Sequence, residues 1–165
     1  MLCDTNIVVP WRAQPRTFVA LMSLYESNYV RFLRLAGNPA RLSGTLVSRV
    51  EGDCELQLSV IEHMPYTSTL ALTYLLPSGS GAGAEQPGIR DRLPDLRLRA
   101  YHDARLLEVE ACQPLPPLRL GSSRRSEREL QQRWVRNMML NKWLEYCAER
   151  GHRFTSAPPE PSAAP

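Results

Sequence analysis

The chain has 165 residues, 43% of them apolar, which is ordinary for one folded domain with a single hydrophobic core. No apolar run reaches the roughly 18 residues that cross a bilayer, so we expect no membrane segment. The net charge is +3, from 20 basic and 17 acidic residues, and because the acids nearly cancel the bases the charge disfavours a nucleic-acid partner.

The four cysteines bear on the cellular compartment. They are scattered, without a CxxC pair, and a chain this long and apolar needs no disulfide framework. The first residues, MLCDTNIVVPW, lack the basic segment and apolar stretch of a secretory signal. We therefore expect a cytoplasmic protein whose thiols are reduced.

Residues 1–14 show no clear periodicity and predict a loose arm. From residue 17 to residue 36 apolar side chains recur at steps of three and four, which predicts an amphipathic helix. Gly37 should end this helix as a left-handed cap, and Pro39 should prevent its resumption. Glu26 and Asn28 lie at the two edges of the apolar stripe, so we expect them to border the core.

After this helix the period of the pattern changes from 3.6 to 2, which indicates strands. Short turn-forming segments separate the alternating runs: EGD at 51–53, MPYT at 64–67 and HDA at 102–104. Such spacing predicts about five strands joined as antiparallel hairpins. The predicted strands are 45–50, 54–60, 69–76, 95–101 and 105–112.

Two further segments are poor in regular structure. Residues 77–94 are rich in Gly, Ser, Ala and Pro, which predicts a mobile surface loop, and they lack the Lys-Ser/Thr that completes a P-loop. PLPPL at 114–118 predicts an extended crossing segment, because proline fits neither a sheet nor a helix interior.

A long helix is predicted over 126–150. Ser126 and Glu129 match a capping box at its start, and Gly151 matches a cap at its end. Asn137 and Asn141 fall on its polar face. Residues 154–165 are Pro-rich and predict a disordered tail.

Together these elements predict a two-layer α+β domain over residues 15–153. A five-stranded antiparallel sheet would carry the N-terminal and C-terminal helices on one face, because an amphipathic helix and a half-apolar sheet bury each other. The second face of the sheet would be open or shared with a partner.

The stretch AYHDA, residues 100–104, is the strongest candidate for chemistry. His102 beside Asp103 suggests a dyad in which the carboxylate orients the imidazole. Neighbours on a strand point to opposite faces, however, and Asp is a common turn residue, so the stretch equally predicts a plain turn. Both interpretations stay open at this point.

Other chemistry finds little support. The three histidines have no partner at a metal-ligand spacing, and no nucleophile motif or cofactor motif is present, so we expect no metal and no cofactor. Trp134 and Met138 fall outside the main apolar face of the last helix. They predict either contact with a second copy or another protein, or packing under the Pro-rich segment.

Four separated motifs carry a resemblance: YESNYVRFLRL, MPYTSTL, AYHDARLLEVEAC and NKWLEYCAERGH. Together, over residues 17–153, they resemble the YqiB-like family, a group of small gammaproteobacterial proteins classed as a domain of unknown function. The resemblance implies a cytosolic bacterial protein without an established activity. Family genes often lie beside genes of nucleotide metabolism, which implies a link of that kind.

Two hypotheses about function follow. The leading one is a non-enzymatic binding or accessory module, with six candidate binding residues: Tyr101, Asn28, Tyr66, Glu108, Trp134 and Met138. The alternative is a small enzyme in which His102 is the general acid or base and Asp103 or Glu26 is its carboxylate partner.

Overall fold

The computed structural model describes residues 15–77, 91–113 and 125–155. The arm at 1–14, most of the predicted loop, the Pro-rich segment at 114–118 and most of the tail lie outside the described residues. In chain order the elements are α2 (Phe18–Ala36), η1 (Pro39–Arg41), β1 (Thr45–Ser48), β2 (Glu55–His63), β3 (Thr67–Leu76), β4 (Asp91–Tyr101), β5 (Leu106–Gln113) and α3 (Arg125–Glu149).

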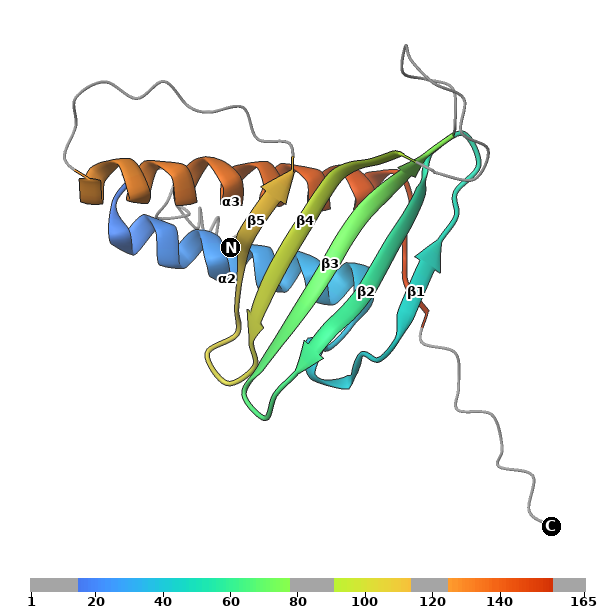
Figure 1. Cartoon of the computed structure of the whole chain (residues 1–165), viewed down its shortest axis with the longest axis horizontal. Helices are drawn as coiled ribbons and strands as arrows, with labels where there is room; N and C mark the ends of the chain where they lie inside the picture. Colours follow the sequence, from blue (N-terminus) through green and yellow to red (C-terminus); the bar gives the residue numbers. More distant parts are fainter. Residues whose placement is uncertain (1–14, 78–90, 114–124, 156–165) are drawn as a thin grey trace, which may run out of the picture.

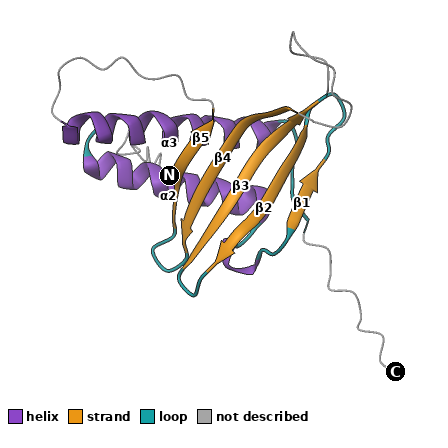
Figure 2. Cartoon of the chain, viewed as in Figure 1, coloured by secondary structure: helices purple, strands orange, loops and turns teal. Residues whose placement is uncertain are grey.

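The fold is the two-layer α+β arrangement that the periodicities predict. The strands form one antiparallel sheet in the order β1-β2-β3-β4-β5, so each strand pairs with its neighbours in sequence. Both helices pack against one face of this sheet (Figure 2). The buried side of the sheet is built mainly from leucines: Leu56, Leu58, Leu70, Leu72, Leu96, Leu98 and Leu107.

The ends of α2 follow from local chemistry. The Thr17 hydroxyl accepts a hydrogen bond from the Ala20 N–H at 3.1 Å, which satisfies one of the free donors of the first turn. At the other end Gly37 has a φ of 79°, and its N–H donates to the Leu33 carbonyl. The predicted helix and its glycine stop are confirmed.

The two helices run in the same direction, because contacts advance together along both (Figure 1). Asn28 of α2 is fully buried and meets Asn137 and Asn141 of α3. The prediction that Asn137 and Asn141 lie on a polar face was therefore wrong. Helix α3 contacts both the sheet and α2, so it buries two faces, and the face toward α2 contains the two asparagines beside apolar side chains.

A second, smaller core lies between the helices. It consists of Ala20, Leu21, Leu24, Tyr25 and Trp134, with Met138 packed against it. Trp134 is only 8% exposed, so little of its side chain remains for a partner. Its position outside the main apolar face is explained by α2, which supplies this second core.

Two predicted boundaries need correction. Strand β4 begins at Asp91, so residues 91–94 belong to the sheet and not to the predicted loop. The chain after α3 also stays ordered beyond residue 153: the Phe154 side chain is buried, and its N–H donates to the Leu35 carbonyl at 2.8 Å. The turn at Gly151, which has a φ of 89°, directs the chain back toward α2.

The buried asparagine contacts predict a large effect of Asn28→Ala. The change removes the amide that donates to the Leu107 carbonyl and the oxygen that accepts from Asn141, so it leaves buried polar groups without partners. We expect the free energy of unfolding to fall by about 1–3 kcal/mol. Urea unfolding followed by circular dichroism measures this loss.

Glu26→Ala is the matched control, since Glu26 lies on the same helix and is exposed. Its effect should stay within about 0.5 kcal/mol. Equal effects of the two changes would contradict a structural role for the asparagine contacts.

Candidate functional site

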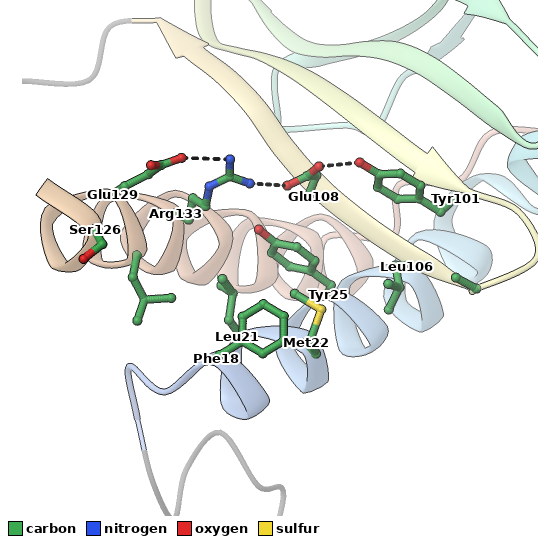
Figure 3. Close-up of a pocket in the computed structure, with 12 residues that line it drawn as sticks. Phe18, Leu21, Met22, Tyr25, Tyr101, Leu106, Glu108, Ser126, Glu129 and Arg133 are labelled. Carbon is green, nitrogen blue, oxygen red and sulfur yellow. Dashed lines mark hydrogen bonds and ion pairs between the residues drawn. The ribbon is translucent and has the colours of Figure 1, made fainter.

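A cavity of about 440 Å³ lies between the first half of α2, the β4–β5 hairpin and the first half of α3 (Figure 3). One side of it is apolar and the other carries charged and phenolic groups. Its lining residues are Phe18, Leu21, Met22, Tyr25, Tyr101, Ala104, Leu106, Glu108, Ser126, Glu129, Leu130 and Arg133.

A hydrogen-bonded chain of four side chains forms the polar side. The Tyr101 hydroxyl donates to one Glu108 oxygen at 2.7 Å, and Arg133 donates to the other at 3.3 Å. Arg133 also donates to Glu129, one helical turn earlier, at 3.1 Å. Figure 3 shows these groups in a row above the apolar residues of the two helices.

The β4–β5 hairpin positions the two sheet residues of this chain. Tyr101 is paired with Leu106 across the hairpin, and Arg99 is paired with Glu108. The turn between the strands closes at Arg105, which has a φ of 53°. Because β5 is an edge strand, the Glu108 side chain can reach past it to Arg133 of α3.

Tyr25 adds a hydroxyl that is only weakly engaged. Its side chain is 4% exposed, and its oxygen forms no hydrogen bond of ordinary geometry to the described residues, although Arg133 and Glu108 lie close enough to interact with it. Figure 3 shows this hydroxyl pointing toward the space between Arg133 and Glu108. Burial, and next the negative charge of Glu108, raise the pKa of Tyr25 to about 12 although Arg133 acts in the opposite direction. The phenol therefore stays protonated at physiological pH.

The same causes act on Tyr101. Burial first, and then the hydrogen bond to Glu108, raise the pKa of Tyr101 above its usual value. Both phenols at the cavity are consequently neutral hydrogen-bond donors. Neither is suited to act as a base near pH 7.

Of the residues predicted from sequence, the structure brings only Tyr101 and Glu108 into this cavity. Tyr66 is 70% exposed at the β2–β3 turn, and Glu26 is exposed on α2. Asn28, Trp134 and Met138 lie in the interface between the helices.

Sequence reasoning missed Tyr25 and Arg133. Tyr25 lies on the apolar stripe of α2, where the periodicity predicts an ordinary core residue. Arg133 is one of several arginines in an exposed part of α3. Neither residue can be identified as a site residue from its own sequence context. Tyr25 and Arg133 become candidates only when the structure shows that β5 places Glu108 beside both of them.

His102 takes part in a different cluster. Its Nε2 lies 2.8 Å from the Ser68 hydroxyl, which is also 3.0 Å from Nδ1 of His63. Its Nδ1 lies 3.4 Å from the Pro65 carbonyl. Ser68 is buried and pairs with Ala100, so His102 faces the helix-covered side of the sheet.

Asp103 does not orient this imidazole. Its carboxylate accepts a hydrogen bond from the Ala104 N–H at 2.9 Å, which is the local bond expected of a turn residue. The described residues provide no hydrogen bond or ion pair between a carboxylate and His102. The cluster ties the tips of two neighbouring hairpins together.

A third polar cluster has the residue types of a catalytic triad. Nδ1 of His152 lies 3.0 Å from the Ser48 hydroxyl, and its Nε2 lies 3.3 Å from Asp53. The Ser48 oxygen also accepts the Arg153 N–H at 3.1 Å. Ser48 and His152 are buried, so a substrate has no access to this hydroxyl. The contacts fasten the chain after α3 to β1 and to the β1–β2 turn.

Residues 15–77, 91–113 and 125–155 contain no group of three or more His, Cys, Asp or Glu side chains arranged to hold a metal ion. Neither of their two long helices is apolar over a stretch that would cross a membrane.

Comparison with protein families gives one match. Residues 31–153 match the family described as "Protein of unknown function (DUF1249)". No curated protein and no solved structure matches the chain. The match starts within α2, so Phe18, Leu21, Met22 and Tyr25, which form the α2 wall of the cavity, precede it.

The cluster at Asp53 predicts a pH-dependent contribution to stability. Burial alone would raise the pKa of Asp53, but hydrogen bonds from Cys54, Arg150 and His152 outweigh it and hold the pKa below its ordinary value of 3.8. A lowered pKa stabilises the fold above the unfolded-state pKa, and this stabilisation is lost as the pH falls through the folded-state pKa. Asp53→Asn should therefore destabilise the protein at pH 7 and have a shrinking effect below about pH 4.

Urea unfolding of the wild type and Asp53→Asn from pH 7 down to pH 3 tests this. Glu51→Gln, an exposed change in the same turn, is the control and should have little effect throughout. A constant difference between Asp53→Asn and wild type across this range would refute the stabilising role of the carboxylate.

The contacts of Ser68 predict that His102→Ala destabilises the protein more than Asp103→Ala does. His102→Ala removes a hydrogen bond to a buried hydroxyl and should lower the free energy of unfolding by about 0.5–1.5 kcal/mol. Asp103→Ala affects an exposed turn residue and should cost no more than about 0.5 kcal/mol. Thermal and urea unfolding of both variants compare the costs, and a larger cost for Asp103→Ala would show that the turn itself dominates.

Proposed function

The chain belongs to the DUF1249 family, whose description assigns no activity, and we propose that it is a non-enzymatic binding module. Its ligand site is the cavity between α2, the β4–β5 hairpin and α3. The observation that carries this proposal is the buried Tyr25 hydroxyl, which lines a largely apolar cavity and forms no hydrogen bond of ordinary geometry to the described residues.

The size and composition of the cavity support a small-molecule ligand. Ligand pockets commonly enclose about 300–1,000 Å³ and combine an apolar lining with a few polar groups that fix orientation. This cavity has a volume of about 440 Å³, an apolar side and a short row of polar side chains. A buried polar atom without a partner is costly, and a ligand that supplies the partner recovers that cost on binding.

Other buried atoms without partners do not have this setting. Three other buried atoms lack a hydrogen bond among the described residues, and none belongs to a residue that lines the cavity: Arg99 Nε, the Asn141 side-chain oxygen and the Trp143 indole nitrogen. Arg99 Nε lies 2.8 Å from Glu110 in an ion pair. Asn141 lies between the helices, and Trp143 lies in the main core. Only the Tyr25 hydroxyl combines the missing partner with a place in the cavity wall.

Binding is better supported than the enzymatic alternative. That alternative requires His102 beside Asp103 or Glu26, and the contacts of His102 go to Ser68 and Pro65 instead. Asp103 is engaged by the Ala104 backbone, and Glu26 is exposed on the outer side of α2. At the cavity itself both tyrosines are held in their neutral forms, which favours recognition over acid–base chemistry.

The narrower expectations from the resemblance remain part of this proposal. They are membership of the YqiB-like group of gammaproteobacteria, a cytoplasmic location and a link to nucleotide metabolism. The last of these puts nucleosides, with the charged nucleotides as their comparison, into any ligand screen. Nucleosides should then perturb the same residues as simpler probes of the cavity.

Ala104→Trp tests the proposal because Ala104 is an exposed turn residue at the cavity. A bulky side chain there should obstruct the site without disturbing the core. Wild-type protein titrated with indole, a neutral probe of suitable size, should show saturable amide chemical-shift changes at cavity residues. Ala104→Trp should weaken indole binding at least about tenfold, which corresponds to about 1.4 kcal/mol.

Ala148→Trp is the matched control, since Ala148 is exposed near the far end of α3. This variant should bind indole as the wild type does. If indole and a wider fragment set, including nucleosides, leave the cavity amides unperturbed at millimolar concentrations, the cavity is not a ligand site.

A further inference from the structure

We propose that the ligand of this cavity is uncharged and carries a hydroxyl or amide group that binds between Tyr25 and Glu108. This inference rests on the proposed function and names the chemical class that the site accepts. It follows from which polar groups at the cavity are already paired and which one is not.

The charged groups of the cavity form one network, in which Arg133 is shared by two carboxylates and one negative charge is in excess. Arg133 donates to Glu108 and to Glu129, and Glu108 also accepts from Tyr101. The described residues therefore leave no charge in the lining without an opposite charge beside it. A ligand anion would lie close to Glu108, and a ligand cation would compete with Arg133 for the same carboxylate. An anion would lose hydration next to an excess of negative charge, and a cation would lose hydration while it displaced Arg133 from a carboxylate.

The polar group of the cavity that is least engaged is neutral, since the Tyr25 hydroxyl has only weak contacts with Arg133 and Glu108. The Tyr25 hydroxyl can donate one hydrogen bond and accept another. It is buried and points toward the space between Arg133 and Glu108 (Figure 3). Burial and the nearby Glu108 raise the pKa of Tyr25 to about 12, so its proton remains available for donation.

Glu108 can accept more than it does. One oxygen accepts from Tyr101 and the other from Arg133, Tyr25 contributes a weaker contact, and each carboxylate oxygen has two lone pairs. A ligand hydroxyl could accept from Tyr25 and donate to Glu108 at the same time, and an amide could do so through its oxygen and its N–H. Groups that both donate and accept therefore match this end of the cavity.

The rest of the ligand meets apolar side chains. Leu21 and Met22 of α2, Leu106 of β5 and Leu130 of α3 line the side away from the charged row. Phe18 is exposed at the start of α2 and also lines the cavity. A compact apolar or aromatic body with one neutral polar group at its end fits this division.

Five probes with the same ring separate the alternatives: benzyl alcohol, benzamide, toluene, benzoate and benzylamine. Dissociation constants from amide chemical-shift titrations of the full chain rank them. Benzyl alcohol and benzamide should bind about three- to tenfold more tightly than toluene, because one neutral hydrogen bond is worth about 0.5–1.5 kcal/mol. Benzoate and benzylamine should bind more weakly than both.

Tyr25→Phe removes the hydroxyl and keeps the ring. It should reduce the affinity for benzyl alcohol to that for toluene and leave the toluene affinity unchanged. Without ligand, the melting temperature should rise or stay the same, because the change removes a buried polar atom that has no partner. Tyr29→Phe is the control, since Tyr29 is a buried tyrosine one turn further along α2 that does not line the cavity. It should not alter the order of the five probes.

Each contrary result has a distinct meaning. If benzoate or benzylamine binds most tightly at the cavity, the site binds ligands, but the inference that the ligand is uncharged is wrong. For benzoate, the next residues to test would be the exposed Arg125 and Arg128 in the first turns of α3. If benzyl alcohol and toluene bind equally and Tyr25→Phe changes neither, Tyr25 does not recognise the ligand and the inference fails. If none of the probes binds, the proposed function fails with it.

Discussion

The structure depends on a cluster of buried asparagines that joins both helices to the edge of the sheet. Strand β5 is the last strand, so the outward-facing N–H and C=O groups of its backbone have no further strand to pair with. Asn28 of α2 donates to the Leu107 carbonyl, and the Asn137 oxygen of α3 accepts the Val109 N–H at 3.0 Å. The two side chains thus replace the partners that a sixth strand would supply. An edge covered in this way is also protected against pairing with another chain.

This attachment determines where the cavity forms. The asparagines fix α2 and α3 to the middle of β5, and the first halves of both helices extend beyond the sheet edge (Figure 1). Beyond that edge the β4–β5 hairpin is the part of the sheet, among the described residues, that the helices can pack against, and their facing side chains build the small core around Trp134. The cavity lies beside this core, with Glu108 as the sheet residue that reaches Arg133. A change that loosened the asparagine cluster would therefore alter the site as well as the stability.

The periodicity of the sequence was sufficient for most of the fold. Steps of three and four placed α2 and α3, and alternation with turn residues placed five antiparallel strands, because each pattern reports one apolar face. The periodicity failed where buried residues are polar, as at Asn137 and Asn141.

The candidate site was less predictable from the sequence than the fold. Tyr101 and Glu108 were recognised as candidates, but their meeting with Tyr25 and Arg133 depends on how the helices lie against β5, which no local pattern reports. Adjacency misled at His102 and Asp103, whose side chains have separate partners.

Within residues 15–77, 91–113 and 125–155, residue types associated with catalysis form three clusters, and the accessibility of each cluster distinguishes its role. His102 with His63 and Ser68 holds two hairpin tips together, and His152 with Ser48 and Asp53 anchors the chain after α3. In both clusters the hydroxyl is buried and already bonded, so its contribution is to stability. At the cavity the polar chain is likewise paired, yet it ends beside an apolar space and an unpartnered phenol. A ligand can complete an arrangement of that kind, whereas the two histidine clusters are already complete without one.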